Sequence, residues 1–179
     1  MRKIVAGLFM SLDGVIEDPS EWTGPWFSAE VGQAVGSLIA AQDAMLLGRV
    51  TYDAFAAHWP HQTGEMAESM NGAIKYVVSG TLRSAGWRNT TLIPRDRAAE
   101  QIAGLKQQPG KNIGMTGSGT LVSWLLREGL LDELRLLVFP VVLGHGKRLF
   151  AEPGDKVPLK LIDSAAFGTG VLSLAYTRA

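Results

Sequence analysis

The sequence predicts an α/β protein with a mixed central sheet, parallel in its first part and antiparallel at its C-terminal edge. Up to about residue 130, short apolar runs that end near glycines alternate with segments whose apolar residues recur at helical spacing. After that point the apolar runs follow one another without helices between them. We expect one domain over residues 1–179, because a domain averages about 150 residues and no linker-like stretch divides the chain.

Composition excludes several classes of protein. Hydrophobic residues make up 46% of the chain and charged residues 19%, which is typical of a globular protein and not of a disordered one. Seventeen Lys and Arg balance seventeen Asp and Glu, so we expect neither a nucleic-acid partner nor a membrane surface. The chain has no cysteine, which excludes disulfides and thiol nucleophiles and is consistent with a cytoplasmic location.

The first predicted elements form a strand-helix-strand unit. Two apolar runs, Ile4–Met10 and Ala44–Leu47, predict buried strands. Between them, apolar residues three or four positions apart predict a crossover helix over residues 28–41. A third strand is predicted over Ile74–Ser79, where Gly80 ends the run.

The remaining elements bring the change from parallel to antiparallel. We predict a helix after Pro94, a strand over 112–116, a helix that Gly129 ends, a strand over Leu134–Val142, and an antiparallel pair over Leu159–Ala165 and Val171–Thr177. The strand over Leu134–Val142 is apolar on both faces, which suits a central strand or one covered by a second subunit. From this pattern we expect a homodimer.

Two glycine-containing turns, each between a predicted strand and a predicted helix, are candidate anion sites. The first is Gly48-Arg49-Val50-Thr51, and the second is Thr116–Thr120 with the sequence Thr-Gly-Ser-Gly-Thr. Exposed N–H groups at a helix start bind phosphates, and Arg49 adds a planar cation. Two such sites suit the two phosphates of a dinucleotide. The alternative is that the glycines serve only positive φ and the Ser and Thr side chains cap helices.

Other motifs fail on spacing. The segment 104–111 differs from a P-loop, and the segment 117–122 lacks the third glycine of a Rossmann fingerprint. His58 and His61 resemble half of a metal site, but Pro60 lies between them and packing beside Trp59 explains them better. We therefore expect no metal.

The order of several short motifs resembles the dihydrofolate-reductase-like superfamily, in the branch of the reductase domain of the riboflavin-biosynthesis deaminase-reductase. The resemblance covers almost the whole chain and is most specific over residues 117–150. The motifs are, in order, Ser11-Leu12-Asp13-Gly14-Val15-Ile16, Leu47–Tyr52, Val77-Val78-Ser79, Gly117–Leu121, Leu131–Leu134 and Pro140–Gly146.

The resemblance implies a three-layer αβα fold with a mixed sheet of about eight strands, and NADPH as cofactor. It places Gly48, Arg49 and Thr51 at the cofactor phosphates and Ser79 near the 2′-phosphate of the adenosine. By the same similarity the pyrophosphate would contact the second turn, which consists of Gly117, Ser118, Gly119 and Thr120.

The resemblance further implies hydride transfer to a pterin-like or ribosylaminopyrimidine-like heterocycle, such as the substrate of 5-amino-6-(5-phosphoribosylamino)uracil reductase or of dihydrofolate reductase. The helix position of the pterin-binding carboxylate corresponds to Glu30, and Thr116 stands where the riboflavin-pathway reductase has a pyrimidine-binding glutamate. Residues 10–12 would line the nicotinamide.

Two further groups are candidates for the acceptor site. Asp13 follows the first strand, where burial would raise its pKa and suit it as the acid, although an Asp-Gly turn explains it equally well. Trp26 belongs to an aromatic loop with Trp22, Pro25 and Phe27 that would stack on a flat heterocycle or else be core. Lys147 and Arg148 would bind a phosphorylated substrate or be solvated.

Three functions therefore compete. The first is an NADPH-dependent reductase of a small heterocycle. The second is a non-catalytic nucleotide-binding module of the same fold. The third is a hydrolase that uses Ser118 with His145, which requires those two side chains to lie within hydrogen-bond reach.

Overall fold

The chain folds around one eight-stranded sheet. The computed structural model describes residues 1–151 and 153–179. Its strands are β1 (Ile4–Ser11), β2 (Gln42–Gly48), β3 (Ile74–Ser79), β4 (Thr90–Pro94), β5 (Asn112–Met115), β6 (Glu133–Phe139), β7 (Leu159–Ala166) and β8 (Leu172–Arg178). Their order in the sheet is β4-β3-β2-β5-β1-β6-β8-β7. All pairs from β4 to β6 are parallel, whereas β8 pairs antiparallel with both β6 and β7, so the predicted mixed sheet is confirmed.

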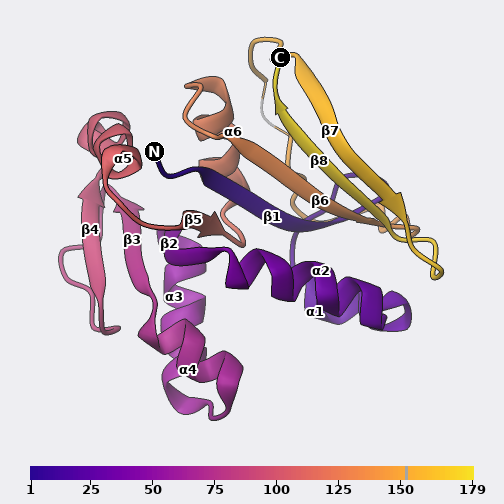
Figure 1. Cartoon of the computed structure of the whole chain (residues 1–179), viewed down its shortest axis with the longest axis horizontal. Coiled ribbons are helices and arrows are strands. Elements are labelled where there is room, and N and C mark those ends of the chain that lie inside the picture. Colours follow the sequence, from indigo (N-terminus) through magenta and orange to yellow (C-terminus); the bar gives the residue numbers. More distant parts are fainter. Residues whose placement is uncertain (152) are drawn as a thin grey trace.

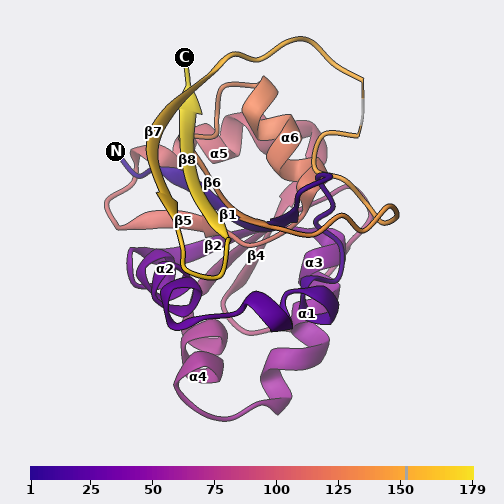
Figure 2. The same ribbon diagram turned by 90° about the vertical axis from the view of Figure 1, so that its right-hand side faces the viewer.

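Helices cover both faces of the sheet. They are α1 (Pro19–Trp22), α2 (Ala29–Ala40), α3 (Arg49–His58), α4 (Glu65–Gly72), α5 (Ala98–Gln107) and α6 (Gly119–Arg127). Figure 1 shows α5 and α6 on one face, with α2 and α3 on the other. Figure 2, which looks onto β7 and β8, shows the same two helical layers with the sheet between them. The arrangement is the predicted three-layer fold.

The core is divided by the sheet. The largest cluster lies between the sheet and α5 and α6, and it includes Leu134, Leu136 and Val138 of β6. A second cluster lies against α3 and α4. A third one lies under the first turn of α2, where Val31 packs with Leu137 and Phe139. The apolar pattern on both faces of β6 is therefore explained within one chain, and it no longer argues for a second subunit.

Strand β6 ends at Phe139, three residues before the predicted end at Val142. The physical reason is Pro140, which has no N–H to continue a sheet ladder. Strand β4 and the helices α1 and α4 were not predicted; α1 has only four residues, none of them buried. Strand β4 is a short edge strand with one buried residue, Ile93, and α4 buries only Ala67 and Met70, so neither shows a periodic apolar pattern.

Within the part of the chain that the structure describes, none of the helices has the length and apolar character needed to cross a membrane.

Candidate functional site: a cleft at the carboxyl edge of the sheet

The candidate site lies where the direction of the crossovers changes. Strands β2 and β5 are parallel neighbours, so their carboxyl ends lie side by side. The chain leaves β2 into α3 on one face of the sheet and leaves β5 into α6 on the other (Figure 1). In open α/β sheets such a switch point forms a crevice in which ligands bind. The two glycine-containing turns of the sequence occupy this point.

Helices α3 and α6 begin at this crevice without side-chain caps. Neither Gly48 before α3 nor Ser118 before α6 provides a capping hydrogen bond. In contrast, the Ser28 side chain caps α2 by accepting from the Val31 N–H at 3.3 Å. The first N–H groups of a helix have no partners within it, and they carry partial positive charge. Two helix starts that face the same crevice therefore remain available to an anionic ligand.

The two turns are in direct contact, and that contact explains their glycines. A Cβ atom on Gly48 would lie 1.9 Å from Ser118 Oγ, and one on Gly117 would lie 3.1 Å from Thr51 Cγ2. Gly48 has φ −83°, which any residue can adopt, whereas Ser118 itself has φ +64°. The alternative that these glycines serve positive φ and that Ser118 caps a helix is therefore wrong. The glycines permit two chain segments to approach each other.

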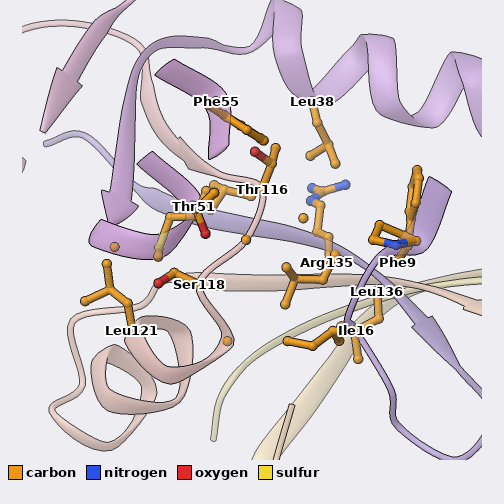
Figure 3. A pocket seen from close by; sticks show the side chains of 18 of the residues that line it. Phe9, Ile16, Leu38, Thr51, Phe55, Thr116, Ser118, Leu121, Arg135 and Leu136 are labelled. Carbon is orange, nitrogen blue, oxygen red and sulfur yellow. The ribbon is translucent and has the colours of Figure 1, made fainter. Parts of the chain in front are cut away.

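A cleft of about 1650 Å³ opens beside these turns. A pocket for one drug-sized ligand measures about 300 to 1,000 Å³, so this cleft has room for two ligands side by side. Figure 3 shows Thr51, Thr116 and Ser118 on one side of the cleft, and Phe9 and Leu38 on the other. The cleft thus has a polar wall formed by the turns and a largely apolar wall formed by β1 and α2.

Three cationic side chains line the polar part. Arg49 forms an ion pair with Asp53 one turn along α3, at 2.8 Å, and both side chains are nearly half exposed. Arg95 follows β4 and lines the cleft beside Ser79; the described residues offer it no ion pair. Lys147 Nζ donates to Thr120 Oγ1 at 3.1 Å. Cations and free helix starts together make this part of the cleft suitable for phosphates.

Most of the predicted site residues line this cleft. They are Gly48, Arg49, Thr51, Ser79, Thr116, Gly117, Ser118, Gly119 and Thr120. Asp13, Trp26 and Glu30 are not among the lining residues. Residues 10–12, which were expected beside the nicotinamide, do not line the cleft, whereas Leu8 and Phe9 just before them do.

Asp13 has a different position and charge from those expected. Its carboxylate accepts hydrogen bonds from Ser11 Oγ at 2.6 Å and from the N–H groups of Gly144 and Leu143 at 2.9 and 3.1 Å. These bonds, the Ser11 bond foremost, hold the pKa of Asp13 well below its usual range. The expectation of a raised pKa is therefore wrong. Asp13 is an ionised group that fixes the turn at residues 143–144 to the end of β1.

We expect Asp13→Asn to destabilise the fold in a pH-dependent manner. The pKa of Asp13 is lowered by folding, so the carboxylate stabilises the native state above its unfolded pKa of 3.8, and this contribution decreases as the pH falls further. The difference in free energy of unfolding between wild type and variant, measured by urea titration, should decrease below about pH 4. Asp155→Asn, at an exposed position, is the control. A difference that stays constant from pH 7 to pH 3 would contradict this assignment.

Trp26 and Glu30 have structural surroundings instead of ligand-facing ones. Trp26 packs partly buried against the cluster of Val31 and Phe139. Glu30 Oε2 accepts from the Gly168 N–H at 3.1 Å and thereby joins the start of α2 to the turn between β7 and β8. Trp22 and Trp26 of the aromatic loop therefore pack against the core, as the alternative interpretation held, whereas Pro25 and Phe27 are exposed.

The requirement of the hydrolase hypothesis is not met in the described chain. His145 Nδ1 contacts the Leu143 carbonyl at 2.9 Å and forms no hydrogen bond with Ser118. Arg148 Nε donates to the main-chain carbonyl of Asp13 at 2.9 Å, and Arg148 does not line the cleft. Lys147 remains the basic residue of this pair that faces the cleft.

Sequence reasoning missed several residues of the cleft wall, among them Ile16, Leu38, Arg95 and Arg135. Leu38 is only half-buried, although its spacing predicts a core position. Arg135 lies in a strand that was interpreted as continuously apolar. A single arginine inside such a run was the available signal, because a charged residue in a central strand needs a polar partner or an open space.

Comparisons with known proteins agree with this architecture. The model of the RibD C-terminal domain matches residues 2–173. The uncharacterized protein YwjB of Bacillus subtilis is 33% identical over 99% of both chains. A deaminase/5-amino-6-(5-phosphoribosylamino)uracil reductase from Thermotoga maritima superposes with a TM-score of 0.72 at 16% identity, over 99% of this chain and 57% of that one. Dihydrofolate reductase from Enterococcus faecalis gives 0.66 at 12% identity, over 98% and 96%.

The sheet order is thus that of a dihydrofolate-reductase-like fold. Within this class, the chain belongs to the RibD C-terminal domain family.

Proposed function

We propose that the protein is an NADPH-dependent reductase of a small planar heterocycle. The observation that supports this most is the pair of uncapped helix starts, α3 and α6, which meet at Gly48 and Ser118 and face one cleft. The main-chain N–H groups there suit a pyrophosphate. A Cβ atom on Gly48 or on Gly117 would fill the space between the two turns. The residues present therefore fit a dinucleotide.

In this proposal, each part of the cleft binds a different part of the ligands. Residues 117–120 and Arg49 bind the pyrophosphate, and Arg95 with Ser79 binds the 2′-phosphate. The bound cofactor would supply a hydride. Phe9, Ile16 and Leu38 form an apolar wall that excludes water and orients the acceptor. Asp13 has no part in proton transfer here; it is a positioning residue for the turn at 143–144.

The affinities of NADPH and NADH test the proposal. Binding to the wild type, followed by fluorescence, should favour NADPH by at least tenfold, since charge-assisted hydrogen bonds contribute about 1.5 to 3 kcal/mol. Arg95→Gln should reduce that preference, whereas Arg49→Ala should weaken both cofactors. Arg97→Gln is the matched control, because Arg97 lies two residues away, is exposed and pairs with Glu100. Equal affinity for both cofactors, or none for either, would contradict the proposal.

One observation favours a second candidate, a non-catalytic nucleotide-binding module. The expected acid, Asp13, is ionised and engaged elsewhere. This candidate predicts the same cofactor affinities but no consumption of NADPH with any heterocyclic acceptor. Loss of absorbance at the nicotinamide band in the presence of an acceptor separates the two.

A further inference from the structure

Arg135 is a cation inside the half of the cleft that the proposed cofactor site does not use. It lies on β6 opposite Gly7 of β1. In Figure 3 its guanidinium lies close to Leu38, with Phe9 at its side and Thr51, Thr116 and Ser118 across the cleft. A guanidinium facing an apolar wall in a ligand-sized space is positioned to bind something that enters that space.

The protein satisfies only one edge of this guanidinium. Glu133 Oε2 accepts from Arg135 Nε at 3.0 Å and from Nη2 at 2.8 Å. The other oxygen of Glu133 accepts from Lys3 Nζ at 2.9 Å. Among residues 1–151 and 153–179, nothing accepts a hydrogen bond from Nη1. Arg135 therefore presents a free N–H edge.

The side chains of Lys3, Glu133 and Arg135 together carry an excess of positive charge. Burial opposes ionisation of Glu133, but the hydrogen bonds from Lys3 and Arg135 hold its pKa below the usual range. One carboxylate is thus shared by two cations, which leaves a net charge of about +1 on the three side chains. An oxygen with negative charge would complete the pairing.

No carboxylate from α2 competes for this edge. Glu30, in the first turn of α2, is bound to the Gly168 N–H and does not line the cleft. Asp163 does line it, but from the edge strand β7, where it is exposed. Glu17 and Asp18 also line the cleft, but from the loop after β1, where both are exposed and where Glu17 Oε2 accepts from the Lys147 N–H at 3.1 Å. On the β6 side of the cleft a ligand therefore meets the donor edge of Arg135.

We propose that Arg135 determines which acceptor the protein takes, by binding an acidic oxygen of the heterocycle. This inference rests on the proposed function and specifies its substrate class. The acceptor is a planar ring with a carboxylate or an enolate oxygen toward β6. A ring with a cationic diamino edge would place donors against donors and is disfavoured.

Isothermal titration calorimetry with three probes tests the proposal. The probes are orotate, which offers a carboxylate, barbiturate, which offers an enolate, and 2,4-diaminopyrimidine, which offers a donor edge. All three are titrated into the wild type with and without NADPH. We expect at least one acidic probe to bind at least tenfold more tightly than the diamine. Which acid binds better distinguishes the two sources of the oxygen.

Variants assign the effect to Arg135. Arg135→Gln should weaken the acidic probe at least tenfold, Arg135→Lys should retain part of the affinity, and NADPH affinity should stay within twofold in both. Lys160→Gln, an exposed charge outside the cleft lining, should change neither. Thermal unfolding shows whether each variant is folded. If Arg135→Gln does not fold, the affinity of Arg135→Lys for the acidic probe decides the test.

The proposal is overturned if no acidic probe binds, if the diamine binds as tightly as the acids, or if acid binding is unchanged in both Arg135 variants. Its failure is distinct from failure of the cofactor site. Loss of NADPH binding with acid binding intact would contradict the proposed function alone, since Arg135 and Arg49 are tested by different ligands.

Discussion

Replacing Gly48 with alanine is expected to weaken NADPH binding by at least tenfold and to lower the free energy of unfolding by about 1 to 3 kcal/mol. The added Cβ would lie 1.9 Å from Ser118 Oγ and 2.9 Å from Ser118 Cβ. One turn must therefore move away from the other. Because both turns line the phosphate-binding part of the cleft, the movement separates groups that would contact one ligand.

Two further variants show that the effect comes from this contact. Ser118→Gly in the Gly48→Ala background removes the obstructing side chain and also suits the φ of +64° at that position, so it should restore much of the affinity. Gly36→Ala is the matched control, because a Cβ on Gly36 of α2 meets nothing within 4 Å. It should stabilise the protein by about 0.5 to 1 kcal/mol through helix propensity. Full affinity in Gly48→Ala would contradict the site.

Lys75→Ala is expected to lower the free energy of unfolding by about 3 to 5 kcal/mol. The side chain is fully buried, and its Nζ donates to the carbonyls of Ala73, Arg88 and Asn71 at 2.7, 3.1 and 3.2 Å. It also lies 4.2 Å from the centre of the Trp87 ring. Alanine would leave a cavity and three carbonyls without this donor. Lys75→Met fills the cavity and should cost less.

The same residue predicts a dependence on pH. Burial, with Arg88 nearby, lowers the pKa of Lys75 from 10.5 to about 8. Between these values the unfolded chain binds a proton that the folded chain does not, so stability rises with pH in this window. The free energy of unfolding of the wild type, relative to Lys75→Met, should therefore increase from pH 8 to pH 10.5. A flat difference in urea titrations would show that Lys75 keeps its ordinary pKa.

The parts of the fold that the sequence predicts are those with periodic apolar residues. Strand β3 has the predicted bounds, and α2 lies within its predicted range with Ser28 as cap. Strand β4 was missed because it is a short edge strand with a single buried side chain, so its burial leaves no pattern. The end of β6 was predicted too late because Pro140, which ends the strand, lies within a run of apolar residues.

For the candidate site, the sequence indicated which residues could bind an anion, but it did not indicate which of them lie together in the fold. The turns at Gly48 and at residues 117–120 could be found because glycine, small polar residues and arginine at a helix start indicate an anion site. Their mutual contact depends on the pairing of β2 with β5, which comes from distant parts of the chain. The surroundings of Asp13 and Arg135 could not be predicted for the same reason. Asp13 accepts from the N–H of Leu143, which lies 130 residues away, and Arg135 lies opposite Gly7 of the adjacent strand β1.

The central claim is that the two turns bind one dinucleotide, and a crystal structure of the NADPH complex tests it most directly. We predict the pyrophosphate within hydrogen-bond distance of the N–H groups of residues 117–120, the 2′-phosphate beside Arg95 and Ser79, and the Arg135 half of the cleft left free for an acceptor. NADPH bound at any other place, or a cleft that stays free of it at millimolar cofactor, would contradict the account.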